Sequence, residues 1–169
     1  MGKIFSYIDG FTRVYPLLII FYSFLSSILH NNQKELIFTF IMLAADIFNH
    51  FIKMRVFKVI MGDKKYPIVG SGKRPQKMNC GLFVNGKASK SYGMPSGHSQ
   101  IAWLFSTYTL LNLPKDTKYR GFISAFLIGL ATLISYSRVY WSKCHTLQQV
   151  IVGGIFGVIL GKYISLFNF

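Results

Sequence analysis

Acidic side chains are scarce in this sequence. It contains only five aspartates and glutamates among 169 residues, against 19 lysines and arginines. So few carboxylates favour chemistry that requires no metal ion. The two cysteines, Cys80 and Cys144, form no metal-binding pattern with the four histidines. We interpret them as bystanders whose pairing depends on the redox state of their compartment. The chain also lacks internal repeats and low-complexity tracts, which excludes repeat architectures.

Long apolar runs are the dominant feature instead. Hydrophobic residues make up 51% of the chain and aromatic residues 17%. The apolar cores of these runs contain only two charged residues, Asp46 and Lys162. We therefore predict an all-α polytopic bundle that forms a single domain over residues 1–169. A soluble all-helical protein is the alternative, because runs of this length also occur as core helices. The membrane-spanning helices are expected at about 14–29, 36–58, 98–113, 121–138 and 146–164.

The net charge of +14 would suggest nucleic-acid binding in a soluble chain. Here the cations cluster between Lys53 and Lys90 and do not follow a polar helix face. This clustering favours anionic lipid or phosphate as the partner and argues against nucleic acid. No cleavable signal peptide is evident, because the short mixed start is not followed by a small-residue cleavage pattern. We expect the first helix to be retained.

Residues 92–100 read Tyr-Gly-Met-Pro-Ser-Gly-His-Ser-Gln, directly before an apolar helix. The first turn of a helix has unpaired N–H groups and a positive dipole end, so it favours an anion. Ser96 can cap the turn or donate to the anion, and Gly97 allows a phosphate oxygen to approach the backbone. His98 can give or take a proton near neutral pH. The alternative is an ordinary helix start capped by Ser96, with His98 at the membrane interface.

The expected topology brings distant residues together. Successive spans alternate in direction, so the ends of the second and fourth spans lie on the same membrane face as the starts of the third and fifth. The long polar segment 61–95, which is interrupted by two prolines, is expected to form a partly ordered lid or entrance on this face. The residues that meet there are Lys58, Arg74, Ser96, Gly97, His98, Arg138 and His145.

Such a set is suited to phosphoryl transfer. Arg74 and Arg138 have planar guanidinium groups that match paired phosphate oxygens, and a lysine adds a point charge. One histidine can attack phosphorus while the other protonates the leaving group, so neither a metal nor another cofactor is required. The residues alone leave open which histidine attacks. Taken singly, Lys58 and Arg138 could be snorkelling anchors at helix ends, and His145 a helix cap.

The order Lys…Arg-Pro, Pro-Ser-Gly-His, Ser-Arg…His resembles the type 2 phosphatidic acid phosphatase superfamily of membrane lipid phosphatases. Within it, residues 92–100 and 137–150 are most similar to the dolichyl diphosphatase branch, which hydrolyses polyprenyl diphosphates. The resemblance implies that His145 is the nucleophile that forms a phosphohistidine and that His98 is the general acid. It also implies a phosphate pocket formed by Arg74, Ser96, Gly97, Arg138 and a lysine, in an endoplasmic reticulum membrane or another internal membrane.

Three departures from the family pattern affect the expected site. The position seven residues before Arg74 is Pro67, where the family has its lysine; we favour Lys58 over Lys64 and Lys65 as the equivalent. The loop between Arg138 and His145 has one residue more than usual. Gln149 stands where most of the superfamily has aspartate, one helical turn after His145. Its carbonyl could still accept the imidazole N–H and orient the ring, as the dolichyl diphosphatase branch also has glutamine there.

The sequence thus predicts a membrane phosphatase that converts a polyprenyl diphosphate to the monophosphate. A phosphatidate-type lipid phosphatase is the enzymatic alternative, and a catalytically silent lipid-binding scaffold is the alternative of another class. Asp46 and His50 share a face of the second span but are left out of the site, because hydrogen bonding between helices explains them. The lipid chain length, the membrane orientation of the site and the oligomeric state stay open.

Overall fold

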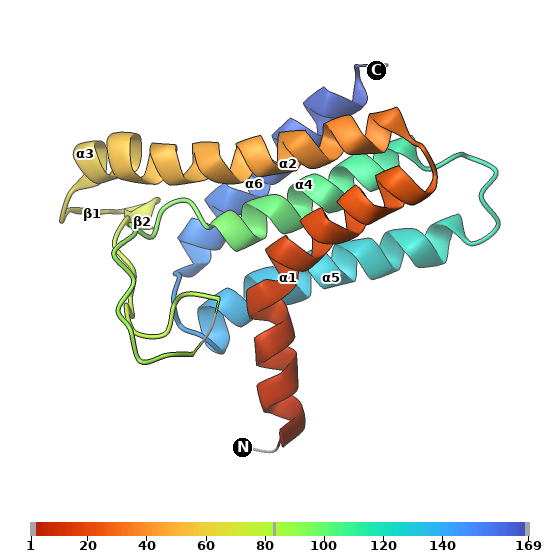
Figure 1. Cartoon of the computed structure of the whole chain (residues 1–169). Coiled ribbons are helices and arrows are strands. Elements are labelled where there is room, and N and C mark those ends of the chain that lie inside the picture. Colours follow the sequence, from red (N-terminus) through yellow and green to blue (C-terminus); the bar gives the residue numbers. More distant parts are fainter. Residues whose placement is uncertain (1–2, 83, 168–169) are drawn as a thin grey trace.

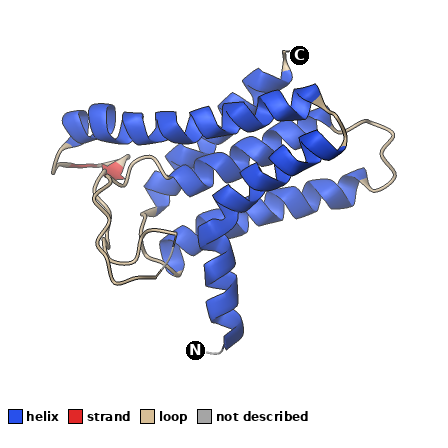
Figure 2. Cartoon of the chain, in the orientation of Figure 1, coloured by secondary structure: helices blue, strands red, loops and turns tan. Residues whose placement is uncertain are grey.

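The structure of the chain is a computed structural model that describes residues 3–82 and 84–167. Phe83, which belongs to the expected site loop, lies outside the described residues. Helices make up most of the fold, and a single two-stranded antiparallel ribbon is described (Figure 2). The elements are α1 (Lys3–Leu29), α2 (Gln33–Phe51), the π-helical turn η1 (Ile52–Phe57), α3 (Lys58–Met61), β1 (Lys65–Tyr66), β2 (Gly70–Ser71), α4 (Gly97–Asn112), α5 (Arg120–Tyr140) and α6 (Leu147–Ser165).

Three helices begin at residues whose side chains accept hydrogen bonds from the first turn. Asn32 caps α2 by accepting from the Glu35 N–H, and Ser96 caps α4 by accepting from the Ser99 N–H. Thr146 and Gln149 form a reciprocal capping box at the start of α6. The starts of α4 and α6 lie one residue from the predicted positions, and α2 begins three residues before its predicted start.

Four continuous helical stretches are long and apolar enough to cross a membrane: 6–29, 33–61, 120–140 and 147–165. The predicted all-α bundle of membrane helices is confirmed. The fifth expected span, 98–113, corresponds to α4, which is shorter than the other four helical stretches. This helix has 16 residues, or about 24 Å at 1.5 Å per residue, against a hydrocarbon thickness of about 30 Å. It lies in the centre of the bundle and contacts α1, α2, α5 and α6 (Figure 1).

Glycines allow α6 to pack directly against the backbone of α4. A Cβ at Gly153 would lie 2.3 Å from the Ser96 carbonyl oxygen, and one at Gly157 would lie 2.3 Å from the Gln100 carbonyl oxygen. Gly161, four residues further on, is similarly close to α4. This repeat of small residues brings the two helix starts side by side. The Ser96 N–H donates to the Gln149 carbonyl over 2.9 Å as a result.

The segment between α3 and α4 covers one end of the bundle (Figure 1). The ribbon β1–β2 and an isolated bridge between Met78 and Ala88 give it partial order. A disulfide joins Cys80 in this segment to Cys144, the residue before His145. The cysteines are therefore structural, and their interpretation as bystanders is wrong.

We predict that Gly157→Ala destabilises the protein by about 1–3 kcal/mol, because the added methyl group meets backbone atoms of α4 that cannot rotate away. Thermal unfolding of the detergent-solubilised protein measures the effect. Gly129→Ala on α5 is the control, since nothing lies within 4 Å of its Cβ position. Equal unfolding temperatures for the two variants would contradict the proposed role of the close α4–α6 contact.

Candidate functional site

His145 is held between two side chains in the loop before α6. It is 2% exposed. Its Nε2 lies 2.9 Å from Nη1 of Arg74, and its Nδ1 lies 3.0 Å from Oε1 of Gln149. A guanidinium can only donate, so Nε2 accepts and Nδ1 carries the proton that Gln149 accepts. His145 is therefore a neutral imidazole whose Nε2 lone pair faces the site.

Gln149 is itself fixed by two backbone carbonyls. Its Nε2 donates to the carbonyl oxygens of Ser71 and Lys73, each over 2.8 Å. These bonds determine which end of the amide faces His145 and leave Oε1 as the only acceptor for the ring. The structure places Gln149 one helical turn below His145, the position that the sequence spacing predicts for an orienting residue.

The charge environment keeps His145 unprotonated. Burial lowers the pKa of its imidazole well below the ordinary value of 6.5, and nearby Arg74, Lys53 and Arg138 lower it further. Burial also lowers the pKa of the Arg74 guanidinium, to about 10, which leaves it charged at neutral pH. The result is a neutral nitrogen base next to the charged guanidinium of Arg74.

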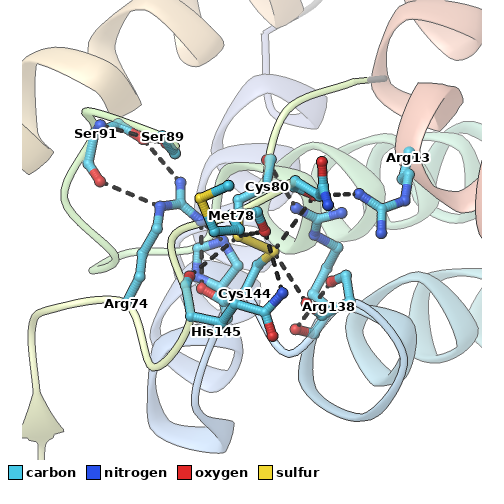
Figure 3. The surroundings of a disulfide bond; sticks show 12 residues. Arg13, Arg74, Met78, Cys80, Ser89, Ser91, Arg138, Cys144 and His145 are labelled. Carbon is cyan, nitrogen blue, oxygen red and sulfur yellow. Dashed lines mark hydrogen bonds between the residues drawn. A yellow bond between two sulfur atoms is a disulfide. The ribbon is translucent and has the colours of Figure 1, made fainter. Parts of the chain in front are cut away.

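Arg74 is positioned by the polar segment in which it lies. Its Nε donates to the Ser91 carbonyl over 3.1 Å and its Nη2 to the Ser91 hydroxyl over 2.8 Å. Its Nη1 also donates to the carbonyl of Cys144 over 3.3 Å (Figure 3). The guanidinium thus connects the segment before α4 to the loop that carries His145.

Arg138, near the end of α5, is 1% exposed. Its Nη2 donates to the Cys80 carbonyl over 3.3 Å (Figure 3). Its Nε and Nη1 have no hydrogen-bond partner among the described residues, although both atoms are buried. Two buried, charged donors of one guanidinium are suited to an oxyanion with two free oxygens.

The structure brings Lys53 to the cluster, and not Lys58. The Lys53 ammonium lies 3.5 Å from the Cβ position of Gly97, and the residue is 7% exposed. Lys58 is exposed and lines a separate cavity of about 560 Å³, which has Arg74 in its wall. Lys53 follows Asn49 by one turn and shares its buried face, so the register from Asn49 was the available sequence signal. It lies in the π-helical turn η1, a geometry often found at functional sites.

His98 is oriented by a residue that the sequence patterns did not indicate. Its Nε2 lies 2.9 Å from the backbone carbonyl oxygen of Arg13 on α1. Because a carbonyl only accepts, this ring nitrogen carries a proton. Ser96 caps the helix and is fully buried, and Gly97 faces Asn49 and Lys53. Asn49 in turn donates to the side-chain oxygen of Gln100 over 2.6 Å, which joins α2 to α4.

Asp46 and His50 are exposed on α2 and form no hydrogen bond to the cluster. Within the described residues, no group of three or more His, Cys, Asp or Glu side chains has a metal-binding arrangement.

The fold and site define a class of protein: an integral membrane helical bundle with a largely buried cluster of two histidines and three cations at one end. Comparison with protein families assigns residues 34–169 to the PAP2 superfamily. The match covers most of the chain, and the chain belongs to this superfamily. The resemblance inferred from the sequence is confirmed.

Several named proteins are similar to part or most of this chain. Dolichyldiphosphatase from Saccharomyces cerevisiae is 28% identical over 163 residues, which are 93% of this chain and 61% of the yeast protein. Human Dolichyldiphosphatase 1 is 44% identical over 77 residues, 39% of this chain and 32% of the human protein. Lipid phosphate phosphatase gamma from Arabidopsis thaliana is 36% identical over 81 residues, 44% of this chain and 35% of that protein. The chain thus aligns with about a third to three fifths of these relatives. No solved structure matches it.

We predict that His145 is still neutral at pH 6.5, with its proton on Nδ1. Imidazole ¹⁵N shifts of the detergent-solubilised protein measure this, and His145→Gln identifies the signal. Arg74→Gln should raise the pKa toward the ordinary value, because it removes one of the cations that oppose protonation. A His145 ring that is already protonated above pH 6.5, or that does not respond to Arg74→Gln, would contradict this description.

Proposed function

We propose that the protein is a metal-independent lipid phosphatase that hydrolyses a polyprenyl diphosphate to the monophosphate through a phosphohistidine. The observation that carries the proposal is the neutral Nε2 of His145, which faces the site among Arg74, Arg138 and Lys53. A nucleophilic nitrogen must be unprotonated, and a phosphoryl group must be held by cations. The unprotonated His145 nitrogen and the cations beside it meet both of these conditions.

In the proposed reaction, Nε2 of His145 attacks the terminal phosphorus, and the bond to the bridging oxygen breaks. The leaving lipid monophosphate takes a proton from Nδ1 of His98, which must be doubly protonated once the diphosphate is bound, because its Nε2–H is held by the Arg13 carbonyl. Water then attacks the phosphohistidine and gives a proton back to His98, and inorganic phosphate leaves with the free His145 imidazole restored. The Arg74 contact with Nε2 must give way on binding, and its guanidinium would then donate to phosphate oxygens.

The cations have complementary tasks in this proposal. The unpartnered Nε and Nη1 of Arg138 would donate to two equatorial oxygens, and Lys53 would add a point charge beside the Gly97 turn. Ser96 and Gly97 would contribute the positive end of α4. Gln149 would keep the Nδ1 proton in place as positive charge develops on the ring. Lys58 would contribute only at the outer cavity that it shares with Arg74.

An apolar groove between α5 and α6 supports an amphiphilic substrate. Its volume is about 470 Å³, and it includes Leu147, two residues after His145, and Ile159 further along α6. These two positions are about 18 Å apart along a helix, at 1.5 Å per residue. A head group bound at His145 would therefore have space for the first part of its hydrocarbon chain in the groove.

The polyprenyl diphosphate is proposed because the relative named Dolichyldiphosphatase in yeast aligns with 93% of this chain. A phosphatidate-type substrate is the second candidate, favoured by the similarity to lipid phosphate phosphatase gamma of Arabidopsis thaliana. We further propose an endoplasmic reticulum membrane or another internal membrane. The disulfide beside His145 favours a lumenal site, since disulfides persist in oxidising compartments.

The first experiment is an assay of phosphate release by detergent-solubilised protein in the presence of EDTA. We expect release from a polyprenyl diphosphate to exceed release from phosphatidate. His145→Ala should lower it by at least about 1,000-fold, because no other group replaces the nucleophile. The variant must retain the wild-type unfolding temperature. Loss of activity with EDTA would refute the metal-independent mechanism, and folded protein that releases phosphate from neither lipid would favour a silent scaffold.

A tryptophan that fills the groove between α5 and α6 tests whether the groove holds the lipid chain. Ile155→Trp should lower kcat/KM for a long-chain polyprenyl diphosphate by about tenfold, because the indole takes the space of the lipid chain. A short-chain diphosphate should be affected little. The matched control is Leu43→Trp, in a second apolar groove of about 520 Å³ between α1 and α2. Equal losses for the two variants, or for both chain lengths, would argue against the α5–α6 groove as the lipid site.

A further inference from the structure

The first helix carries a partly buried ion pair for which the proposed reaction has no use. Arg13 is 6% exposed, and its Nε lies 2.7 Å from Oδ2 of Asp9, one turn earlier on α1. The family match begins at residue 34, after this helix has ended. Buried ion pairs add little net stability on average, because desolvation offsets their attraction. The burial of the Arg13 guanidinium in this position therefore calls for an explanation other than stability.

The Arg13 side chain reaches the segment that covers the site. Its Nη1 donates a hydrogen bond to the carbonyl oxygen of Asn79 (Figure 3). The carbonyl of the next residue, Cys80, accepts from Nη2 of Arg138. Two guanidinium groups from α1 and α5 thus hold consecutive carbonyls of one loop.

The same loop is connected by a disulfide to the residue before His145, the proposed nucleophile. Cys80 forms the disulfide with Cys144, and the Cys144 carbonyl accepts from Nη1 of Arg74, the group that also contacts Nε2 of His145. A displacement at Asn79 would therefore reach Arg138 through one hydrogen bond and His145 through the disulfide.

Arg13 also faces the second histidine, through its backbone. Its carbonyl oxygen lies 2.9 Å from Nε2 of His98. Pro16, three residues later, lacks an N–H, and α1 changes direction along its length (Figure 1). The turn of α1 that carries Arg13 thus contacts both the 79–80 loop and His98.

We propose that Arg13, held by Asp9, is a positioning residue that fixes the 79–80 loop and through it the placement of Arg138 and His145. It acts through these groups and does not contact the substrate. This inference rests on the proposed phosphatase function. It extends the working site to α1, outside the region that matches the family.

The test compares the wild type with Arg13→Lys and with a pair-removal variant, Asp9→Asn/Arg13→Met. Pair removal should lower kcat for polyprenyl diphosphate by about 10- to 100-fold, because small misplacements of reacting groups are costly. KM should change by less than about threefold, since the bound lipid loses no contact. Arg13→Lys keeps the charge and should recover part of kcat. Arg120→Met is the control, since Arg120 also donates to loop carbonyls, those of Leu113 and Pro114, but between α4 and α5.

A second measurement does not depend on activity. The rate at which a thiol reductant opens the Cys80–Cys144 disulfide, followed by maleimide labelling, should rise several-fold on pair removal and stay unchanged in Arg120→Met. If no lipid phosphate is hydrolysed by the wild type, the proposed function fails while this rate still tests the loop contact. Unchanged reduction rates in the pair-removal variant and in Arg13→Lys would overturn the inference.

A double-mutant cycle separates positioning from general stability. In a Cys80→Ser/Cys144→Ser background, pair removal should cost less kcat than in the wild type, because the connection to His145 is already cut. Equal fold-losses in both backgrounds would overturn the proposed route. So would a kcat loss that Arg13→Lys does not relieve at all. If pair removal prevents folding, Arg13→Lys alone, with an expected kcat loss of about threefold and faster reduction, decides the question.

Discussion

The close approach of α4 and α6 is the contact on which the site depends. Without a Cβ at Gly153 and Gly157, the backbone of α6 lies against the carbonyls of Ser96 and Gln100. The start of α4 carries His98, and the start of α6 follows His145, so helix packing alone brings the two histidines to one end of the bundle. The Ser96–Gln149 backbone hydrogen bond fixes their register. Larger residues at these glycines would separate the histidines before any polar contact could form.

The second constraint is electrostatic. Arg74 and Arg138 lie in a region where backbone carbonyls, and not carboxylates, accept most of their hydrogen bonds, and Lys53 lies beside Gly97. Carbonyls reduce the cost of burying a cation without neutralising it. The site therefore retains positive charge, which disfavours protonation of His145 and favours an anionic ligand. A carboxylate in place of Gln149 would cancel part of that charge. The neutral glutamine orients His145 and leaves the positive charge of the site available to an anionic ligand.

Much of this could be predicted from the sequence, because the relevant signals are local. The apolar runs predicted the helices. The Pro-Ser-Gly-His turn predicted the start of α4, and the spacing of His145 and Gln149 predicted that they contact each other across one helical turn. The alternation of the spans predicted that distant residues meet at one end, but it did not predict the particular contacts between them. The register from Asn49 pointed to Lys53, and only its packing against Gly97 shows that Lys53, and not Lys58, lies in the cluster. The disulfide and the Arg13–Asn79 contact join segments about 65 residues apart, and no periodic pattern in the sequence indicates such contacts. The bounds of α4 agree with the predicted span 98–113 to within one residue, because the cap at Ser96 and the apolar run that follows it are local signals.

The capping box of α6 has a consequence of its own. The Oε1 atom of Gln149 accepts from the Thr146 N–H, which starts the helix, and from Nδ1 of His145, which selects the tautomer. One oxygen thus serves the nucleation of a helix and the alignment of a reactive ring. A frayed α6 would release the ring at the same moment, so partly folded forms of this chain would carry an unaligned histidine. Formation of α6 and alignment of the His145 imidazole therefore depend on the same oxygen atom and occur together.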